Sequence, residues 1–129
     1  MKRAFLWLLC SIWLFACSKS DQHTAGNFEL AGTWRLAETL ADPGDGSGTW
    51  KPASAPLLLI FGADGSIQGD AFPQARRYQK LNDTNIRFTF ADGAFINYTY
   101  SLTNTTLILS GSGCIEPCGL KFKKDTSQN

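Results

Sequence analysis

Hydrophobic and polar residues alternate along most of the chain after residue 30, which is the pattern of half-buried β-strands. The segment 85–90 shows it most cleanly, because every second residue is hydrophobic and the residues between are polar. Clusters of glycine, proline, asparagine and aspartate separate such segments and mark turns. The pattern predicts eight short strands, at about 32–39, 56–61, 66–69, 76–81, 85–90, 96–103, 106–110 and 120–124.

Eight strands joined by short links favour an all-β, antiparallel up-and-down barrel, because a closed sheet has no free edge. The even number makes the last strand antiparallel to the first, so closure is topologically possible. A membrane-spanning barrel needs strands of about 9–11 residues with an apolar outer face. Here one face of the fifth and sixth strands carries Arg87, Asn97 and further polar residues, so we exclude that class. A barrel of this size encloses packed side chains or one small ligand.

The first strand begins with Gly32 and Trp34, which predict the closed end of the barrel, here called the floor. Glycine lets the chain turn tightly into the strand, and the large indole ring plugs one end of the interior. If Phe122 faces inward, Lys124 does so too and lies beside Trp34. A cation over an indole contributes about 0.5–2 kcal/mol. A register slip of one residue would put Lys123 there instead.

Because the first strand runs away from the floor, every odd-numbered link lies at the opposite end of the barrel, here called the mouth. Four links meet there, at 42–55, 70–75, 92–94 and 111–119. The first carries Trp50 and the second carries Phe72, so both are candidate rim residues. Two interpretations stay open: these rings cover the core, or they contact a ligand or a protein partner.

The N-terminal residues follow a different pattern from the rest of the chain. A basic pair at residues 2–3 precedes an apolar stretch at 4–15. A spanning helix needs about 20 apolar residues, so this stretch is too short, and the arrangement is typical of an export signal. We therefore expect the protein to leave the cytoplasm.

The apolar stretch ends in Leu14, Phe15, Ala16 and Cys17, and all of these but Phe15 match the lipobox of bacterial lipoproteins, which the segment resembles. The resemblance implies that residues 1–16 are a cleaved lipoprotein signal peptide. It also implies diacylglycerol on the Cys17 thiol and an N-acyl chain on its amine, which hold the protein on a bilayer at ~0.8 kcal/mol per buried methylene. The serine that follows Cys17 implies sorting to the outer membrane, facing the periplasm or the cell surface. The alternatives are an ordinary secretory signal and a membrane-anchoring helix.

The mature chain divides by composition into three parts. Residues 17–27 are polar and form an acylated, flexible tether. Residues 28–124 carry the predicted barrel, and 125–129 form a polar tail. The mature chain is long enough for one domain with a modest core.

Three motifs in the barrel segment are similar to those of a known family. They are LAGTWRL at 30–36, LIFGADG at 59–65 and CIEPCGLKF at 114–122. In this order behind a lipobox, they resemble the bacterial lipoproteins with a lipocalin-like domain. The resemblance covers roughly residues 28–124 and implies a lipocalin-like barrel.

Cys114 and Cys118 are the two thiols that remain after signal cleavage and acylation. An exported compartment is oxidising, so we expect a disulfide between them. Closing so short a loop contributes about 2 kcal/mol in the chain-entropy model. The alternative is a redox or metal pair, but a metal needs further ligands and the barrel segment contains no histidine.

Composition and charge argue against several functions. Two of the 12 basic residues lie in the signal and 11 acidic residues are present, so the mature chain is close to neutral and offers no basic patch for nucleic acid. The single histidine, His23, lies in the tether, and no serine sits in a nucleophile elbow. Glu38, on the same face as Trp34 by alternation, could pair with Glu116 or Asp70, but acids near turns are usually solvated. We expect no enzyme, no metal and no cofactor beyond the covalent lipid.

The loop at 42–48 contains two acids and three glycines, which invites a calcium or phosphate site. Its acids lack EF-hand spacing, and no helix pattern follows it to bind an anion at its N-terminus. We therefore expect a mobile loop at the rim of the barrel.

Three functions remain open. The first is a lipocalin-like lipoprotein that takes a small apolar or amphipathic molecule into the mouth. The second is a protein-interaction module, such as an inhibitor of lysozymes or proteases. The third is a surface or assembly lipoprotein whose barrel has no pocket. A cavity separates the first from the other two, and a fixed, protruding rim loop would favour the inhibitor.

Overall fold

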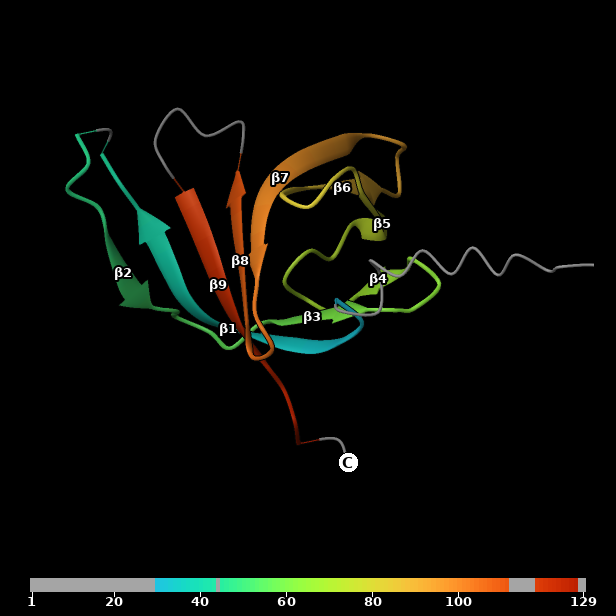
Figure 1. Cartoon of the computed structure of the whole chain (residues 1–129), viewed down its shortest axis with the longest axis horizontal. Coiled ribbons are helices and arrows are strands. Elements are labelled where there is room, and N and C mark those ends of the chain that lie inside the picture. The colour runs from blue at the N-terminus through green and yellow to red at the C-terminus, as the bar shows by residue number, and fades with distance from the viewer. Residues whose placement is uncertain (1–29, 44, 112–117, 128–129) are drawn as a thin grey trace, which may run out of the picture.

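The computed structural model describes residues 30–43, 45–111 and 118–127 (Figure 1). The predicted signal peptide, Cys17 and the tether lie outside these residues. No helix long and apolar enough to cross a membrane occurs in the part that the structure describes. Its strands are β1 (Gly32–Ala41), β2 (Thr49–Pro52), β3 (Leu58–Phe61), β4 (Ile67–Gln68), β5 (Ala75–Lys80), β6 (Asn85–Phe90), β7 (Phe95–Leu102), β8 (Thr106–Gly111) and β9 (Cys118–Lys124).

The strands form one antiparallel sheet in the order β4-β3-β1-β9-β8-β7-β6-β5, with β2 paired to β1. The sheet curls until its two ends meet, since Ser66 forms a β-bridge with Arg77. Next to this bridge the Tyr78 amide donates a hydrogen bond to the Gly65 carbonyl at 2.9 Å. Apart from β2, the strands follow one another in up-and-down order around a nearly closed barrel. The predicted all-β, eight-stranded up-and-down barrel is confirmed.

The link predicted as a loop at 42–55 contains the strand β2, which corrects the sequence prediction. β2 pairs with the far half of β1, whereas β3 pairs with the near half. Between the two, the Ala53 amide donates to the Ala37 carbonyl at 2.9 Å and the Leu36 amide donates to the Leu57 carbonyl at 2.8 Å. Two prolines in this stretch lack an amide donor and interrupt the pairing, so the pattern of residues did not reveal a strand.

β1 contains a bulge at Ala37, because its register against β9 shifts between Leu36 and Glu38. One extra residue changes the face that later residues occupy. Trp34 and Leu36 are buried in the core before the bulge. After it, Thr39 lines the interior and Glu38 forms an outward ion pair. The prediction that Glu38 shares a face with Trp34 is therefore wrong.

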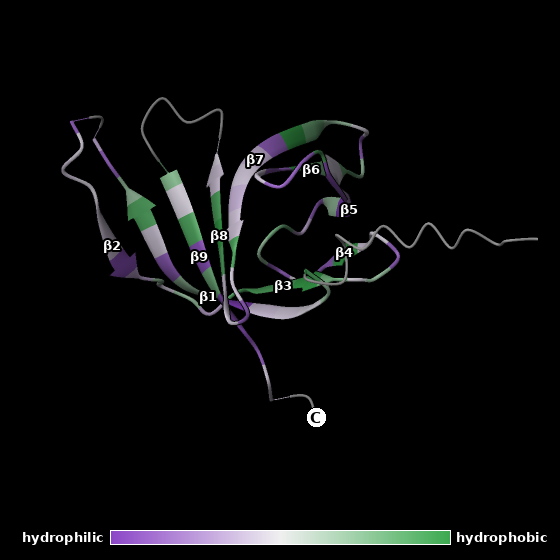
Figure 2. Ribbon diagram, viewed as in Figure 1, coloured by the Kyte–Doolittle hydropathy of each residue, from purple (hydrophilic) through white to green (hydrophobic). Residues whose placement is uncertain are grey.

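The hydrophobic core lies toward the floor of the barrel. Its largest fully buried side chains are Trp34, Phe61, Phe88, Phe122, Leu30, Leu59, Ile86, Leu107 and Leu109. Phe61 meets Tyr78 edge-to-face with ring centroids 4.7 Å apart, and it meets Phe88 at 5.8 Å. Each such pair contributes about 0.5–1.5 kcal/mol beyond the area it buries. Figure 2 shows β3 as hydrophobic throughout and β9 as alternating, as their places in the sheet require.

Candidate functional site

The three predicted floor residues lie together where β1 meets β9. Trp34 is fully buried, and its indole Nε1 donates to the Leu30 carbonyl at 2.8 Å. Lys124 is its ladder partner, and the Lys124 Nζ lies 5.2 Å from the centre of the Trp34 ring. Gly32 has a φ of 128°, a backbone angle that residues with a side chain rarely adopt. A Cβ at this position would lie 3.4 Å from the Lys124 Cε. This end of the barrel is sealed by packing.

The residues after β9 extend this seal. The Asp125 amide donates to the Thr33 carbonyl at 2.8 Å, and the Asp125 carboxylate accepts from Arg35 at 2.6 Å. Hydrogen bonds from Ser127, together with Arg35, lower the pKa of Asp125 to about 2. The first three residues of the predicted tail, 125–127, are thus tied to the start of β1.

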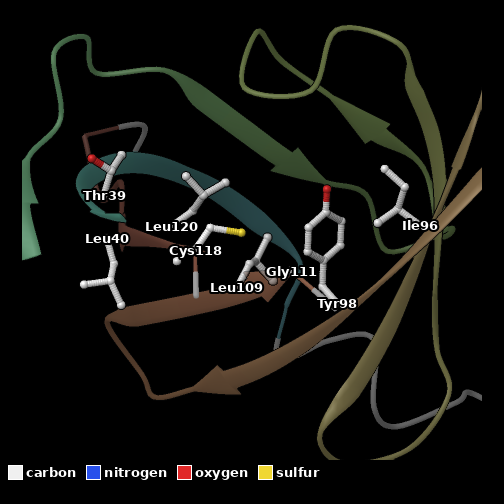
Figure 3. A pocket seen from close by; sticks show the side chains of 9 residues that line it. Thr39, Leu40, Ile96, Tyr98, Leu109, Gly111, Cys118 and Leu120 are labelled. Atoms are coloured by element: carbon white, nitrogen blue, oxygen red, sulfur yellow. The ribbon is translucent and has the colours of Figure 1, made fainter. Parts of the chain in front are cut away.

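The opposite end of the barrel holds a cavity of about 450 Å³ (Figure 3). It lies against the far half of β1 and against β7, β8 and β9. Its lining residues are Thr39, Leu40, Ile96, Tyr98, Leu109, Gly111, Cys118, Gly119 and Leu120. Figure 3 shows the side chains of Tyr98, Leu109 and Leu120 on one side of the strands that carry them. We call this cavity, with its nine lining residues, the mouth cavity.

The mouth cavity exists because the inward positions at this end carry small or short side chains. Thr39, Gly111 and Cys118 occupy the places where large aromatic residues would be needed to complete the core. Ile96 pairs with the buried Phe88, yet its own side chain is 42% exposed. A hydrophobic residue of the inner face that meets solvent indicates that the cavity opens at the mouth.

The lining of the mouth cavity is apolar and uncharged in the described residues, and its only side-chain hydroxyls belong to Thr39 and Tyr98. Burial raises the pKa of the Tyr98 phenol above its usual value of 10.0, so the hydroxyl stays protonated at neutral pH. A mainly apolar wall with few convergent polar groups is typical of sites for small molecules.

Phe72 packs against the hydrophobic core beside Tyr98, which lines the mouth cavity. Its ring packs edge-to-face on Phe88, with centroids 5.1 Å apart, and on Tyr98 at 5.8 Å. It does not line the cavity as the structure describes it. Phe72 therefore positions the Tyr98 ring, and a direct role at the rim stays a prediction.

Trp50 belongs to β2 and packs on the outer face of the barrel, so its predicted place in a loop is wrong. The Lys121 Nζ lies 4.3 Å from the centre of its ring, and Lys121 also forms an ion pair with Glu38. A Cβ on Gly119 would lie 2.7 Å from the Trp50 Cη2, so glycine makes room for the indole. Trp50 covers the outside of the wall whose inside is the mouth cavity. Its contact with a partner remains a prediction.

The loop that raised the question of calcium or phosphate is organised by Asp42. This residue is only 5% exposed, and its carboxylate accepts the amides of Gly46 at 3.1 Å and Gly48 at 2.9 Å. A Cβ on Gly48 would lie 2.5 Å from the Asp42 Cβ. Both carboxylate oxygens of Asp42 thus accept hydrogen bonds from backbone amides of the loop. No group of three or more potential metal ligands occurs among the described residues.

The other chemically interesting residues lie apart. Cys118 opens β9 and lines the mouth cavity, whereas Cys114 and Cys17 lie outside the described residues. Glu38 forms its ion pair on the outer face, and Asp70 accepts the Leu58 amide at 2.5 Å. The structure does not bring these two acids together, and Glu116 is not among the described residues.

No protein-family model, no curated protein and no solved structure matches this chain. The resemblance to lipoproteins with a lipocalin-like domain therefore stays an expectation based on three motifs. The function has to be inferred from the cavity.

Apart from Cys118, sequence reasoning did not single out the residues that line the mouth cavity. Ile96, Tyr98 and Leu120 were assigned to alternating strands without a special role. The available signal was the mixture of large and small residues on the inner face, with glycine at 111 next to Tyr98 across the ladder. This pattern can be interpreted only when the register between β7 and β8 is known.

Proposed function

We propose that this protein is an exported, lipid-anchored barrel that binds a small apolar or amphipathic molecule at its mouth. The observation that supports this proposal is the mouth cavity, which has an apolar lining and an exposed inward Ile96. Its volume of about 450 Å³ lies within the range of small-molecule sites, roughly 300–1,000 Å³. A barrel serving only as a surface or assembly element would have no use for such a space.

The anchor and the disulfide of this proposal rest on the sequence. Diacylglycerol and an N-acyl chain on Cys17 would hold the protein at the outer membrane. A bond between Cys114 and Cys118 would close a short loop next to the mouth cavity, because Cys118 opens β9 and lines that cavity. Activity as an enzyme is not part of the proposal, and neither is binding of nucleic acid, a metal or a cofactor.

The proposal is tested by blocking the mouth cavity and comparing what the protein carries. Ile96→Trp adds bulk on the inner face of β7 at a partly exposed position, so folding should survive. Phe95→Trp is the matched control, because Phe95 is 56% exposed and its ring packs under Arg87 instead. The mature proteins are purified from membranes in the same way, and their extracts are analysed by mass spectrometry. The proposal expects a compound present in wild type and Phe95→Trp and strongly depleted in Ile96→Trp; identical extracts would contradict it.

An inhibitor or protein-interaction role is the second candidate, and the β1–β2 hairpin favours it. Asp42 fixes the loop at its tip, and that tip stands apart from the rest of the barrel at the upper left of Figure 1. A partner bound there would not need the cavity. Inhibition of a lysozyme or a protease that is lost in Lys51→Glu, an exposed change on β2, and kept in Ile96→Trp would support this role.

A further inference from the structure

Tyr98 differs from the other two tyrosines of the chain in the state of its hydroxyl. The Tyr78 hydroxyl donates to the Gly62 carbonyl at 2.9 Å, and the Tyr100 hydroxyl donates to the Asn82 carbonyl at 3.4 Å. The Tyr98 hydroxyl makes no hydrogen bond with any residue that the structure describes, and Tyr98 lines the mouth cavity. This hydroxyl is a donor and acceptor that a molecule in the cavity can engage.

The ring that carries this hydroxyl is held in place by aromatic contacts. Phe72 packs against it with centroids 5.8 Å apart, and Phe88 does so at 5.1 Å. A fixed ring presents its hydroxyl at a defined point, so little conformational freedom is lost when a ligand bonds to it. Figure 3 shows Ile96 beside the Tyr98 ring, with the hydroxyl at the far end of that ring.

The lining of the cavity also selects by charge. None of its nine residues is charged, and the nearby Lys121 is turned to the outer face, where Glu38 and Trp50 engage it. A buried carboxylate or phosphate without a cationic partner is far more costly than a buried hydroxyl that is hydrogen-bonded. The volume of about 450 Å³ corresponds to roughly 15 waters at about 30 Å³ each.

We propose that the ligand of the mouth cavity is an uncharged amphiphile whose single hydroxyl or carbonyl group bonds to the Tyr98 hydroxyl. The body of the ligand is an alkyl chain or a small ring system that packs on Ile96, Leu109 and Leu120. This inference rests on the proposed function and names its ligand class: a neutral alcohol, ester or ketone, and not a fatty acid anion.

The test uses three photoactivatable probes with the same ten-carbon diazirine chain. One ends in a hydroxyl, one in a carboxylate and one in a methyl group. The mature full-length protein is held in nanodiscs, and labelling of the β7, β8 and β9 peptides is followed against probe concentration and normalised to labelling of the lipid. Wild type is compared with Tyr98→Phe and with Tyr100→Phe, a matched control whose hydroxyl lies on a backbone carbonyl.

The hydroxyl probe should saturate the cavity peptides at a concentration at least fivefold lower than the carboxylate probe. Tyr98→Phe should weaken the hydroxyl probe about two- to tenfold, the size of one net hydrogen bond, and leave the methyl probe unchanged. Tyr100→Phe should change neither. Equal or better labelling by the carboxylate probe, or equal effects of the two tyrosine variants, would overturn this inference. If this inference fails but the methyl probe still labels the cavity peptides, the proposed function stands. If no probe labels them, both the inference and the proposed function are overturned.

Discussion

The floor and the mouth of the barrel are built from the same strands and enclose different things. At the floor, Trp34 and Phe122 are fully buried. At the mouth, the same β1 and β9 present Thr39, Leu120 and Cys118 around a cavity. β1 and β9 stay paired from the floor to the mouth, so the difference comes from side-chain size. Alternation decides which residues face inward, and volume decides whether they make a core or a site.

The bulge at Ala37 divides the two ends. Before it, β1 contributes Trp34 to the core; after it, β1 presents Thr39 to the cavity and turns Glu38 outward. The same shift lets Trp50 reach Gly119 on the outer face. A site and its outer cover are thus set by one extra residue in one strand.

The comparison predicts that the two ends respond very differently to truncation. Trp34→Ala should lower the free energy of unfolding by about 3–5 kcal/mol, because it opens a large cavity in the core. Ile96→Ala should change it by about 0.5 kcal/mol or less, because the Ile96 side chain is 42% exposed and borders an existing cavity. Denaturant unfolding of the purified protein measures both. Trp34→Phe, which keeps a ring, serves if Trp34→Ala fails to fold, and equal losses at the two ends would contradict the comparison.

Much of this architecture follows from the sequence. Regular alternation predicted the up-and-down barrel. Parity counted from an inward Phe122 predicted Lys124 beside Trp34, with Lys123 as the alternative, and the structure has Lys124 there. Parity could not foresee the bulge, because an extra residue leaves no mark on the pattern of hydrophobic positions. β2 was missed because glycine and proline surround it and its stability comes from pairing with the far half of β1.

The candidate site was predicted only in outline. The sequence placed an opening at the mouth and named Trp50 and Phe72, the large rings in its loops. The structure turns Trp50 to the outer face and uses Phe72 to support Tyr98. The walls of the cavity consist of ordinary strand residues. Whether they leave space between them depends on the register of several neighbouring strands, and the sequence of one strand does not show this register.

The contact between Trp50 and Gly119 predicts a smaller, conditional effect. Gly119→Val should cost about 1–3 kcal/mol, because its Cβ would meet the indole at 2.7 Å and push β2 away. The same change in a Trp50→Ala background should cost less than half as much, which a double-mutant cycle measures. Ser110→Val is the control, since Ser110 is the exposed ladder partner of Gly119. Additive losses from Gly119→Val and Trp50→Ala would show that the indole does not need this space.

The smallest effect belongs to Asp125 at the floor. Hydrogen bonds from Ser127 and Arg35 lower its pKa from 3.8 to about 2, so between these values the unfolded chain binds more protons than the folded one. The contribution is therefore fully present above pH 3.8 and is lost as the pH falls through about 2. Because the Arg35 side chain that pairs with Asp125 is 47% exposed, salt should weaken the effect. Unfolding of wild type and Asp125→Asn, measured from about pH 5 to pH 2, should give curves that converge as the pH falls. The pKa of Asp64 is also lowered, but Asp64 is present in both proteins, so its titration cancels in the difference between the two curves. A difference that stays constant with pH would mean that Asp125 does not titrate as the floor geometry requires.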